Sequence, residues 1–351
     1  MIFTHLLKKP QATFQNALIA GTAYFNSANF EGNADFATSR IRDDAVFIET
    51  VFDKKATFER LQIGEAGFFR NAIFKDEVSF VVAKIGSNAE FNEAKFYSKA
   101  NFQGCTIGKG AIFTPITFEQ EVNFGGAQIE GNVSFSKCVF KGKGIFDNYH
   151  VKQHVLFDSV IFEKEASFNG AQFDGNANFR YAIFRDNAVF LGSQFKNFCF
   201  YEGTIFSKDV GFQNATYKII YFHEAGERRS QFNGTIDLSG CTYDRVEPIT
   251  FVNEIIERMK RYDRNSYIQM EETLQKAGES RLANRIYYKR KLKESSQMSI
   301  SRQPLDWLYD RLLYLFTGYG VKLGRLLLLM LIIIVVGTFI FQSEGGRTTN
   351  F

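Results

Sequence analysis

The chain has 351 residues, long enough for two or three domains, and a formal net charge of only +4. Phe occurs 40 times beside one Trp and four Pro, a surplus over the usual mixture of Leu, Ile and Val that indicates a repeated core position. Residues 12–220 carry 21 basic and 23 acidic side chains, whereas residues 281–325 carry ten basic and three acidic ones. A basic segment beside a hydrophobic one indicates an anionic membrane face more than nucleic acid.

Residues 1–11 form an N-terminal segment that lacks the pattern of a secretory signal. Met1–Leu7 is short, and Lys8 and Lys9 follow it instead of preceding it. We therefore expect everything before the hydrophobic segment near the C-terminus to start and to stay in the cytosol.

A repeat with no break in register begins at residue 12. Positions spaced by 11 from Phe14 to Phe212 are all aromatic, and a second series from Ile19 to Tyr217 is Ile, Val, Phe or Tyr throughout. A small residue stands two positions before most of them. Neither the helical period of 3.6 nor the strand period of 2.0 fits this spacing. The pattern predicts a core that begins with Phe14, Ile19, Phe25, Phe30, Phe36, Ile41, Phe47, Phe52, Phe58 and Ile63.

A longer period sets the size of one coil. In the second series Ile and Phe alternate from Ile19 to Phe140, so like residues recur every 22 positions. We expect residues 22 apart to be spatial neighbours, with Ile41 touching Ile63 on adjacent rungs. Each coil then has four large slots and four sides. About nine and a half such coils, at roughly 4.8 Å per rung, give a rod of about 45 Å.

The pentad A-x-F-x-x, with a small residue two positions before Phe, resembles the pentapeptide-repeat proteins. The resemblance covers roughly residues 12–245 and implies a β-solenoid, a right-handed quadrilateral β-helix. One residue is inserted at every second corner, so that a coil has 22 residues instead of 20. The regular spacing ends after Tyr217. Residues 219–229 are interpreted as a bulged insertion, and the spacing resumes at Ser230. We place the β-helix at 12–247.

Helical patterns follow the repeat. Residues 248–295 predict a short α-helical region that forms a cap or a hairpin, with a stop at Gly278. Residues 296–320 predict a linker and an amphipathic helix of sequence LDWLYDRLLYLF, whose Trp307 suits a membrane interface.

Residues 321–341 predict one transmembrane helix, with Lys322 and Arg325 reaching out of the apolar layer. A buried core helix is the alternative that this segment leaves open. Ten basic residues precede it and only Arg347 follows, in the tail 342–351. We expect a single-pass protein of the cell membrane with a cytoplasmic N-terminal domain. The order of parts resembles membrane-associated bacterial pentapeptide-repeat proteins, many of which continue beyond this helix. The sequence leaves open whether this chain is a short or truncated form.

Other motifs carry little chemistry. The segment 317–320 (TGYG) is similar to a potassium-channel filter, but it lacks the Val and an earlier membrane helix, which favours a turn. Cys105, Cys138, Cys199 and Cys241 fall in small core slots. His150 and His154 have helical metal-pair spacing but no evident third ligand. No Ser-His-Asp set or phosphate loop occurs, so we predict no enzyme, no cofactor and no metal site.

Three functions remain open on the sequence. The first is a membrane-anchored scaffold that binds an unidentified protein partner and, through its C-terminal helix, membrane lipid. The second is a DNA mimic that binds type II topoisomerases, a mode known among pentapeptide-repeat proteins. It requires a strongly acidic rod, whereas 21 basic and 23 acidic residues give this one a net charge of −2. The third is a subunit of a channel or transporter assembly. We do not expect nucleic acid as a partner.

Overall fold

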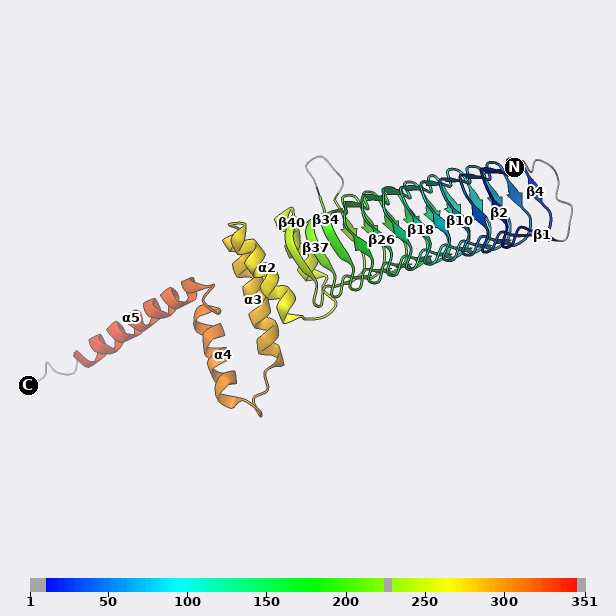
Figure 1. The fold of residues 1–351 in the computed structure, drawn as a ribbon. Coiled ribbons are helices and arrows are strands. Elements are labelled where there is room, and N and C mark those ends of the chain that lie inside the picture. The colour runs from blue at the N-terminus through cyan, green and yellow to red at the C-terminus, as the bar shows by residue number, and fades with distance from the viewer. Residues whose placement is uncertain (1–10, 224–228, 346–351) are drawn as a thin grey trace, which may run out of the picture. The chain divides into compact units, whose positions relative to one another are not determined.

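A computed structural model describes residues 11–223 and 229–345 of the chain. It consists of two compact units, which we call the solenoid unit (Met1–Asp263) and the helical unit (Arg264–Phe351). Figure 1 shows the short strands of the solenoid unit stacked one behind another, and the helices of the helical unit.

The solenoid unit has four walls of parallel strands, and each coil contributes one short strand to each wall. Wall 1 contains β1 (Gln11–Thr13), β5 (Asn33–Asp35), β9 (Ala56–Thr57), β13 (Val78–Ser79), β17 (Ala100–Asn101), β21 (Val122–Asn123), β25 (Gly144–Ile145), β29 (Ala166–Ser167), β33 (Ala188–Val189), β36 (Val210–Gly211) and β39 (Ile236–Asp237). Wall 2 contains β2 (Leu18–Ile19), β6 (Arg40–Ile41), β10 (Gln62–Ile63), β14 (Lys84–Ile85), β18 (Thr106–Ile107), β22 (Gln128–Ile129), β26 (His150–Val151) and β30 (Gln172–Phe173).

Wall 3 contains β3 (Ala23–Tyr24), β7 (Ala45–Val46), β11 (Gly67–Phe68), β15 (Ala89–Glu90), β19 (Ala111–Ile112), β23 (Val133–Ser134), β27 (Val155–Leu156) and β31 (Ala177–Asn178). Wall 4 contains β4 (Asn29–Phe30), β8 (Val51–Phe52), β12 (Ile73–Phe74), β16 (Lys95–Phe96), β20 (Thr117–Phe118), β24 (Val139–Phe140), β28 (Ile161–Phe162), β32 (Ile183–Phe184), β35 (Ile205–Phe206) and β38 (Gln231–Phe232). Three longer strands join walls 2 and 3 into one sheet: β34 (Gln194–Phe200), β37 (Thr216–Tyr221) and β40 (Thr242–Glu247).

The strand register confirms the predicted coil length and the β-solenoid fold. Ile41 pairs with Ile63, and Ile63 pairs with Ile85, in parallel neighbouring strands. The predicted nine and a half coils were too few, since wall 1 has 11 strands in the described part of the chain. The count was low because the coil after Tyr217 contains an insertion and no longer keeps the spacing of 11, although its strands still pair with the coil before it.

Phenyl rings fill the tube in two geometries. Rings at equivalent positions of successive coils lie parallel, as Phe36 and Phe58 do with centroids 5.0 Å apart. Rings on different walls meet edge to face, as Phe25 and Phe36 do at 5.2 Å and 83°. Both are favourable arrangements of aromatic quadrupoles. Of the ten core positions named from the sequence, eight are buried, and Phe14 and Ile19 in the first coil are half-buried.

Small polar residues in the core are satisfied by the coil before them. The hydroxyl of Thr50 donates to the carbonyl of Phe25 at 2.7 Å, and Thr204 donates to Phe179 at 2.6 Å. Ser193 donates to Phe168 in the same way at 2.7 Å. A buried hydroxyl with a partner costs little, so Ser and Thr replace Ala in these slots without loss.

The tight corners require one left-handed residue each. The amide of Ala17 donates to the carbonyl of Phe14 at 2.9 Å and closes a four-residue turn, in which Asn16 has φ 57°. Later coils place Ser27, Asn148 or Gly170 at the same kind of position. A turn with positive φ at its third residue favours Gly and Asn, which explains why these residues are common at the corners.

Residues 249–260 complete the last coil of the solenoid unit. They form the short helices η1 (Ile249–Phe251) and α1 (Val252–Glu257). The Phe251 ring stacks on Phe222 with centroids 4.9 Å apart and thereby extends the aromatic column. The backbone then pairs with β39, because the Ile236 amide donates to the carbonyl of Arg258 at 2.9 Å. Part of the predicted helical region thus belongs to the solenoid core.

The helical unit contains α2 (Arg264–Lys276), α3 (Ser280–Gln297), α4 (Pro304–Thr317) and α5 (Leu323–Gly345). Helices α2 and α3 form the predicted hairpin, and Gly278 at the turn has φ 80°. A buried ion pair joins them, with Nε of Arg290 2.7 Å from Oε1 of Glu271. The two helices also bury four apolar side chains, Met270, Leu274, Ala283 and Ile286.

Replacing Phe96 by Ala is expected to lower the free energy of unfolding by about 3 to 5 kcal/mol, because it opens a cavity in a continuous column. The Phe96 ring lies 5.0 Å from both Phe74 and Phe118. The neighbouring Tyr97 is 51% exposed, and Tyr97→Ala is the matched control, expected to change stability by less than about 0.5 kcal/mol. Equal loss in both variants, measured by chemical denaturation, would contradict the core assignment.

Tyr149 is a large residue in a small slot, and its hydroxyl is buried without a hydrogen-bond partner among the described residues. Tyr149→Phe removes this unsatisfied group and is expected to raise the free energy of unfolding by about 1 to 3 kcal/mol. Tyr201→Phe is the control. The Tyr201 hydroxyl lies 3.2 Å from that of Tyr217, so its removal breaks a hydrogen bond and should lower the free energy of unfolding. A destabilised Tyr149→Phe protein would show that the phenol is satisfied in solution.

Candidate interaction surfaces

The cysteines and histidines are engaged in the fold. All four cysteines are free thiols in the core, and burial raises the pKa of Cys105 and of Cys241 to about 12. Nε2 of His150 lies 3.1 Å from Oδ2 of Asp174, whereas Nδ1 of His154 accepts a hydrogen bond from the Asn176 amide at 3.0 Å. Within residues 11–223 and 229–345, no three His, Cys, Asp or Glu side chains are grouped to hold a metal ion.

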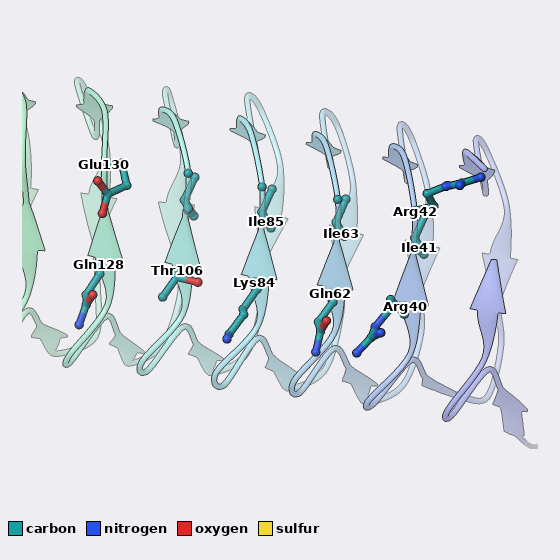
Figure 2. A pocket seen from close by; sticks show the side chains of 14 residues that line it. Arg40, Ile41, Arg42, Gln62, Ile63, Lys84, Ile85, Thr106, Gln128 and Glu130 are labelled. Atoms are coloured by element: carbon teal, nitrogen blue, oxygen red, sulfur yellow. The ribbon is translucent and has the colours of Figure 1, made fainter. Parts of the chain in front are cut away.

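A shallow groove of about 610 Å³ runs along wall 2. Figure 2 shows outward side chains from successive rungs standing in a row beside it. Four rungs of the groove carry Ile41, Ile63, Ile85 and Ile107 in the core behind it. The outward row is Arg40, Gln62, Lys84, Thr106 and Gln128.

Glycine forms the open floor of this groove. Gly64, Gly86 and Gly108 are stacked one rung apart. A Cβ added to Gly64 would collide with the carbonyl oxygen of Arg42, and one added to Gly86 with the carbonyl of Gly64. Only glycine fits where backbones approach this closely. The groove therefore presents bare backbone beside amide, hydroxyl and cationic side chains, which can hydrogen-bond an extended ligand.

The predicted membrane-anchoring residues lie on α4, just before α5 and in its first turn. Trp307 is half-buried on α4, and the guanidinium of Arg311 lies 5.3 Å from its ring. Arg325 donates to the carbonyl oxygen of Tyr314 at 2.9 Å, and the Lys322 ammonium lies 4.4 Å from the Tyr288 ring. Arg325 thus joins α5 to α4, and Lys322 joins the turn before α5 to α3, which are contacts that the sequence did not reveal.

Helix α4 has two faces of different character. Leu305, Leu308, Tyr309, Leu312 and Leu315 are all exposed, at the spacing of one helical face. The opposite face carries Asp310, which is buried. The carboxylate of Asp310 accepts hydrogen bonds from the Ser295 hydroxyl at 2.5 Å and from the Tyr319 hydroxyl at 3.2 Å.

The TGYG segment is a turn, as interpreted from the sequence. Gly318, Tyr319 and Gly320 have φ of 53°, 59° and 83°, and they reverse the chain between α4 and α5. Burial and the nearby Asp310 charge raise the pKa of Tyr319, so its hydroxyl stays protonated and donates.

The contact of Asp310 with Ser295 and Tyr319 was not predicted from the sequence. The available signal was that Asp310 stands opposite the leucine stripe, with Tyr314 and Thr317 one and two turns later.

Helix α5 is long enough and apolar enough to cross a membrane. Its apolar stretch Leu323–Gln342 has 20 residues, about 30 Å of helix, and none of it is buried within the described protein. Among the helices that the structure describes, it is the one that meets these criteria.

Comparison with protein families matches the model of pentapeptide repeats in nine copies, at residues 83–128, 157–200 and 168–216. These residues lie in the middle and later coils of the solenoid. Comparison with the curated proteins and with the solved structures gave no match. The family assignment thus agrees with the repeat read from the sequence and with the coil seen in the structure.

Asp310→Asn is expected to lower the stability of the helical unit by about 1.5 to 3 kcal/mol, because two hydroxyl donors lose a charged acceptor. Trp307 is the single Trp of the chain and lies on α4, so its fluorescence during thermal unfolding reports on this unit. Asp306 is exposed on the same helix, and Asp306→Asn is the control. Equal midpoints for the two variants would show that the Asp310 contact contributes nothing.

Proposed function

Because this chain is a pentapeptide-repeat protein, we propose that it is a membrane-anchored scaffold, which holds a protein partner at the cytoplasmic face of the membrane without catalysis. The observation that carries the proposal is the exposed apolar surface of α5, together with the exposed leucine face of α4. Contiguous apolar surface of this size is rare on monomeric soluble proteins and suits a lipid environment.

The two helices divide the contact with lipid between them. Helix α5 matches the thickness of the hydrocarbon layer, and the α4 leucine face suits the plane of the headgroups. The basic residues near α5 are unevenly divided between its two ends. Four stand before it or in its first turn (Arg302, Arg311, Lys322 and Arg325), whereas Arg347 alone follows it. Basic residues remain on the cytoplasmic side of membrane helices, so this asymmetry supports a cytoplasmic solenoid.

The solenoid supplies the partner-binding surface. Its inward positions are occupied by the core, and its outward positions form straight columns whose chemistry differs from wall to wall. Repeat proteins use such extended surfaces for recognition. Charge argues against DNA mimicry, because 21 basic and 23 acidic residues leave the regular array nearly neutral. The turn at 317–320 likewise offers no support for a pore.

The anchor is tested by placing two charges in α5. Leu331→Asp with Val335→Asp adds about 2.5 to 3.5 kcal/mol of insertion cost for each residue near the centre of the helix. We expect the wild-type chain to stay with sedimented membranes after an alkaline carbonate wash and the double variant to move to the soluble fraction. Leu18→Asp is the control, because Leu18 is 78% exposed on the solenoid.

Release of the wild-type chain by carbonate, or retention of the double variant, would reject the anchor. The scaffold role has its own readout: crosslinking in intact membranes, followed by extraction in mild detergent, should recover one protein in fixed ratio to the chain. Repeated recovery of the chain alone would reject that role and leave the anchor untouched.

A further inference from the structure

Wall 4 carries a column of β-branched apolar residues on its outward side. Val51, Ile73, Val139, Ile161, Ile183 and Ile205 stand one above another at the first position of their strands, and all are half-exposed. The column is interrupted by Lys95 and Thr117. The equivalent column of wall 2 is Arg40, Gln62, Lys84, Thr106, Gln128, His150 and Gln172.

A row of charges runs beside the later part of this column. Each of four successive rungs carries a charged residue two positions after the outward residue of its wall 4 strand. In chain order these are Glu119, Lys141, Glu163 and Arg185. Nζ of Lys141 is 2.8 Å from Glu119, and Nη1 of Arg185 is 4.0 Å from Glu163. The sign therefore alternates along the rod as minus, plus, minus, plus.

When a row of four alternating charges faces a second copy of itself that runs in the opposite direction, each charge lies opposite one of the other sign. If two copies face each other through wall 4 with their rods antiparallel, Glu119 meets Arg185 and Lys141 meets Glu163, each twice about the two-fold axis. The same register places Val139 on Ile161 and Thr117 on Ile183 in the neighbouring column. Every charge of the row then faces its opposite, and the four central β-branched side chains leave water together. Farther from the axis, Lys95 faces Ile205 and Ile73 faces Gln231.

We propose that wall 4 is a self-association surface, on which a second copy of this chain packs antiparallel with its two-fold axis between Val139 and Ile161. This inference does not depend on the membrane anchor. It requires only the outward columns of the solenoid, and it follows the rule that the commonest assemblies are two-fold and self-complementary.

A parallel pairing of the same walls is disfavoured. Lys137 flanks the column on the side opposite to Lys141 in the same coil, and both side chains are exposed. With rods parallel, Lys141 of one copy would meet Lys137 of the other. Like charges in direct opposition destabilise a pair of β surfaces.

The interface is modest in size. Eight rungs overlap in the antiparallel register, from the strand of Ile73 to that of Gln231, or about 34 Å at 4.8 Å per rung. A face one strand wide and of that length lies at or below the roughly 800 Å² per partner of a standard interface. The dimer should therefore depend on protein concentration.

Charge exchange tests the proposal. Light scattering of the full chain in mild detergent, over a range of concentrations, is expected to show a dimer. Lys141→Glu should weaken the dimer at least tenfold, since the new carboxylate faces Glu163. Adding Glu163→Lys should restore it, because the row becomes minus, minus, plus, plus and again matches its reversal. Lys152→Glu beside wall 2 is the matched control, since Lys152 is exposed and pairs with Glu130 at 2.7 Å.

Disulfide trapping fixes the direction of the two rods. Thr117→Cys and Ile183→Cys chains should crosslink when mixed, and neither should crosslink by itself. Three results would overturn the proposal: a monomer at every concentration, equal weakening by Lys141→Glu and Lys152→Glu, or crosslinking of each cysteine variant with itself, which is the mark of parallel rods.

Discussion

The structure depends on the contact between a side chain and the equivalent side chain one coil later. Phe30 and Phe52 stack at 5.0 Å, and Ile41 and Ile63 pair across adjacent strands. Strands as short as these are not stable by backbone hydrogen bonds alone. The continuous apolar column makes each coil stable only on its neighbours, as in other repeat architectures. The half-buried Phe14 and the closing contribution of Phe251 mark the two ends of that column.

This division between inside and outside sets what the protein can do. Inward positions are fixed by volume, so chemistry is confined to outward columns in which one residue per rung can vary freely. The outward face of wall 2 carries polar side chains beside stacked glycines, and that of wall 4 carries a β-branched column beside alternating charges. Neither arrangement resembles an acid–base or nucleophilic site, whereas both resemble surfaces for binding.

The repeating part of the molecule was predicted well from the sequence, because residues that recur every 22 positions lie on neighbouring coils and contact one another. Once Ile recurs at a fixed interval, the neighbour of Ile41 is known without a structure. The hairpin at Gly278 and the turn at 317–320 were readable for a similar reason, since both depend on local glycine chemistry. The bulge within β34, between Phe195 and Phe198, was not, because the aromatic spacing continues through it. The Asp310 contact was also missed. Its place opposite the leucine face of α4 indicates that Asp310 is turned inward. Its partners Ser295 and Tyr319 come from different segments, and no local pattern identifies them.

The central claim is that each coil advances the chain by one rung, and pulsed spin-label distances measure this directly. Labels on Arg40 and Gln194 are separated by seven rungs, since seven successive strand pairings lead from β6 to β34 along wall 2. Their mean distance should be about 34 Å with a narrow distribution, and labels on Arg40 and Gln128, four rungs apart, should give about 19 Å. Broad distributions, or distances that do not grow in proportion to the number of rungs, would contradict the account.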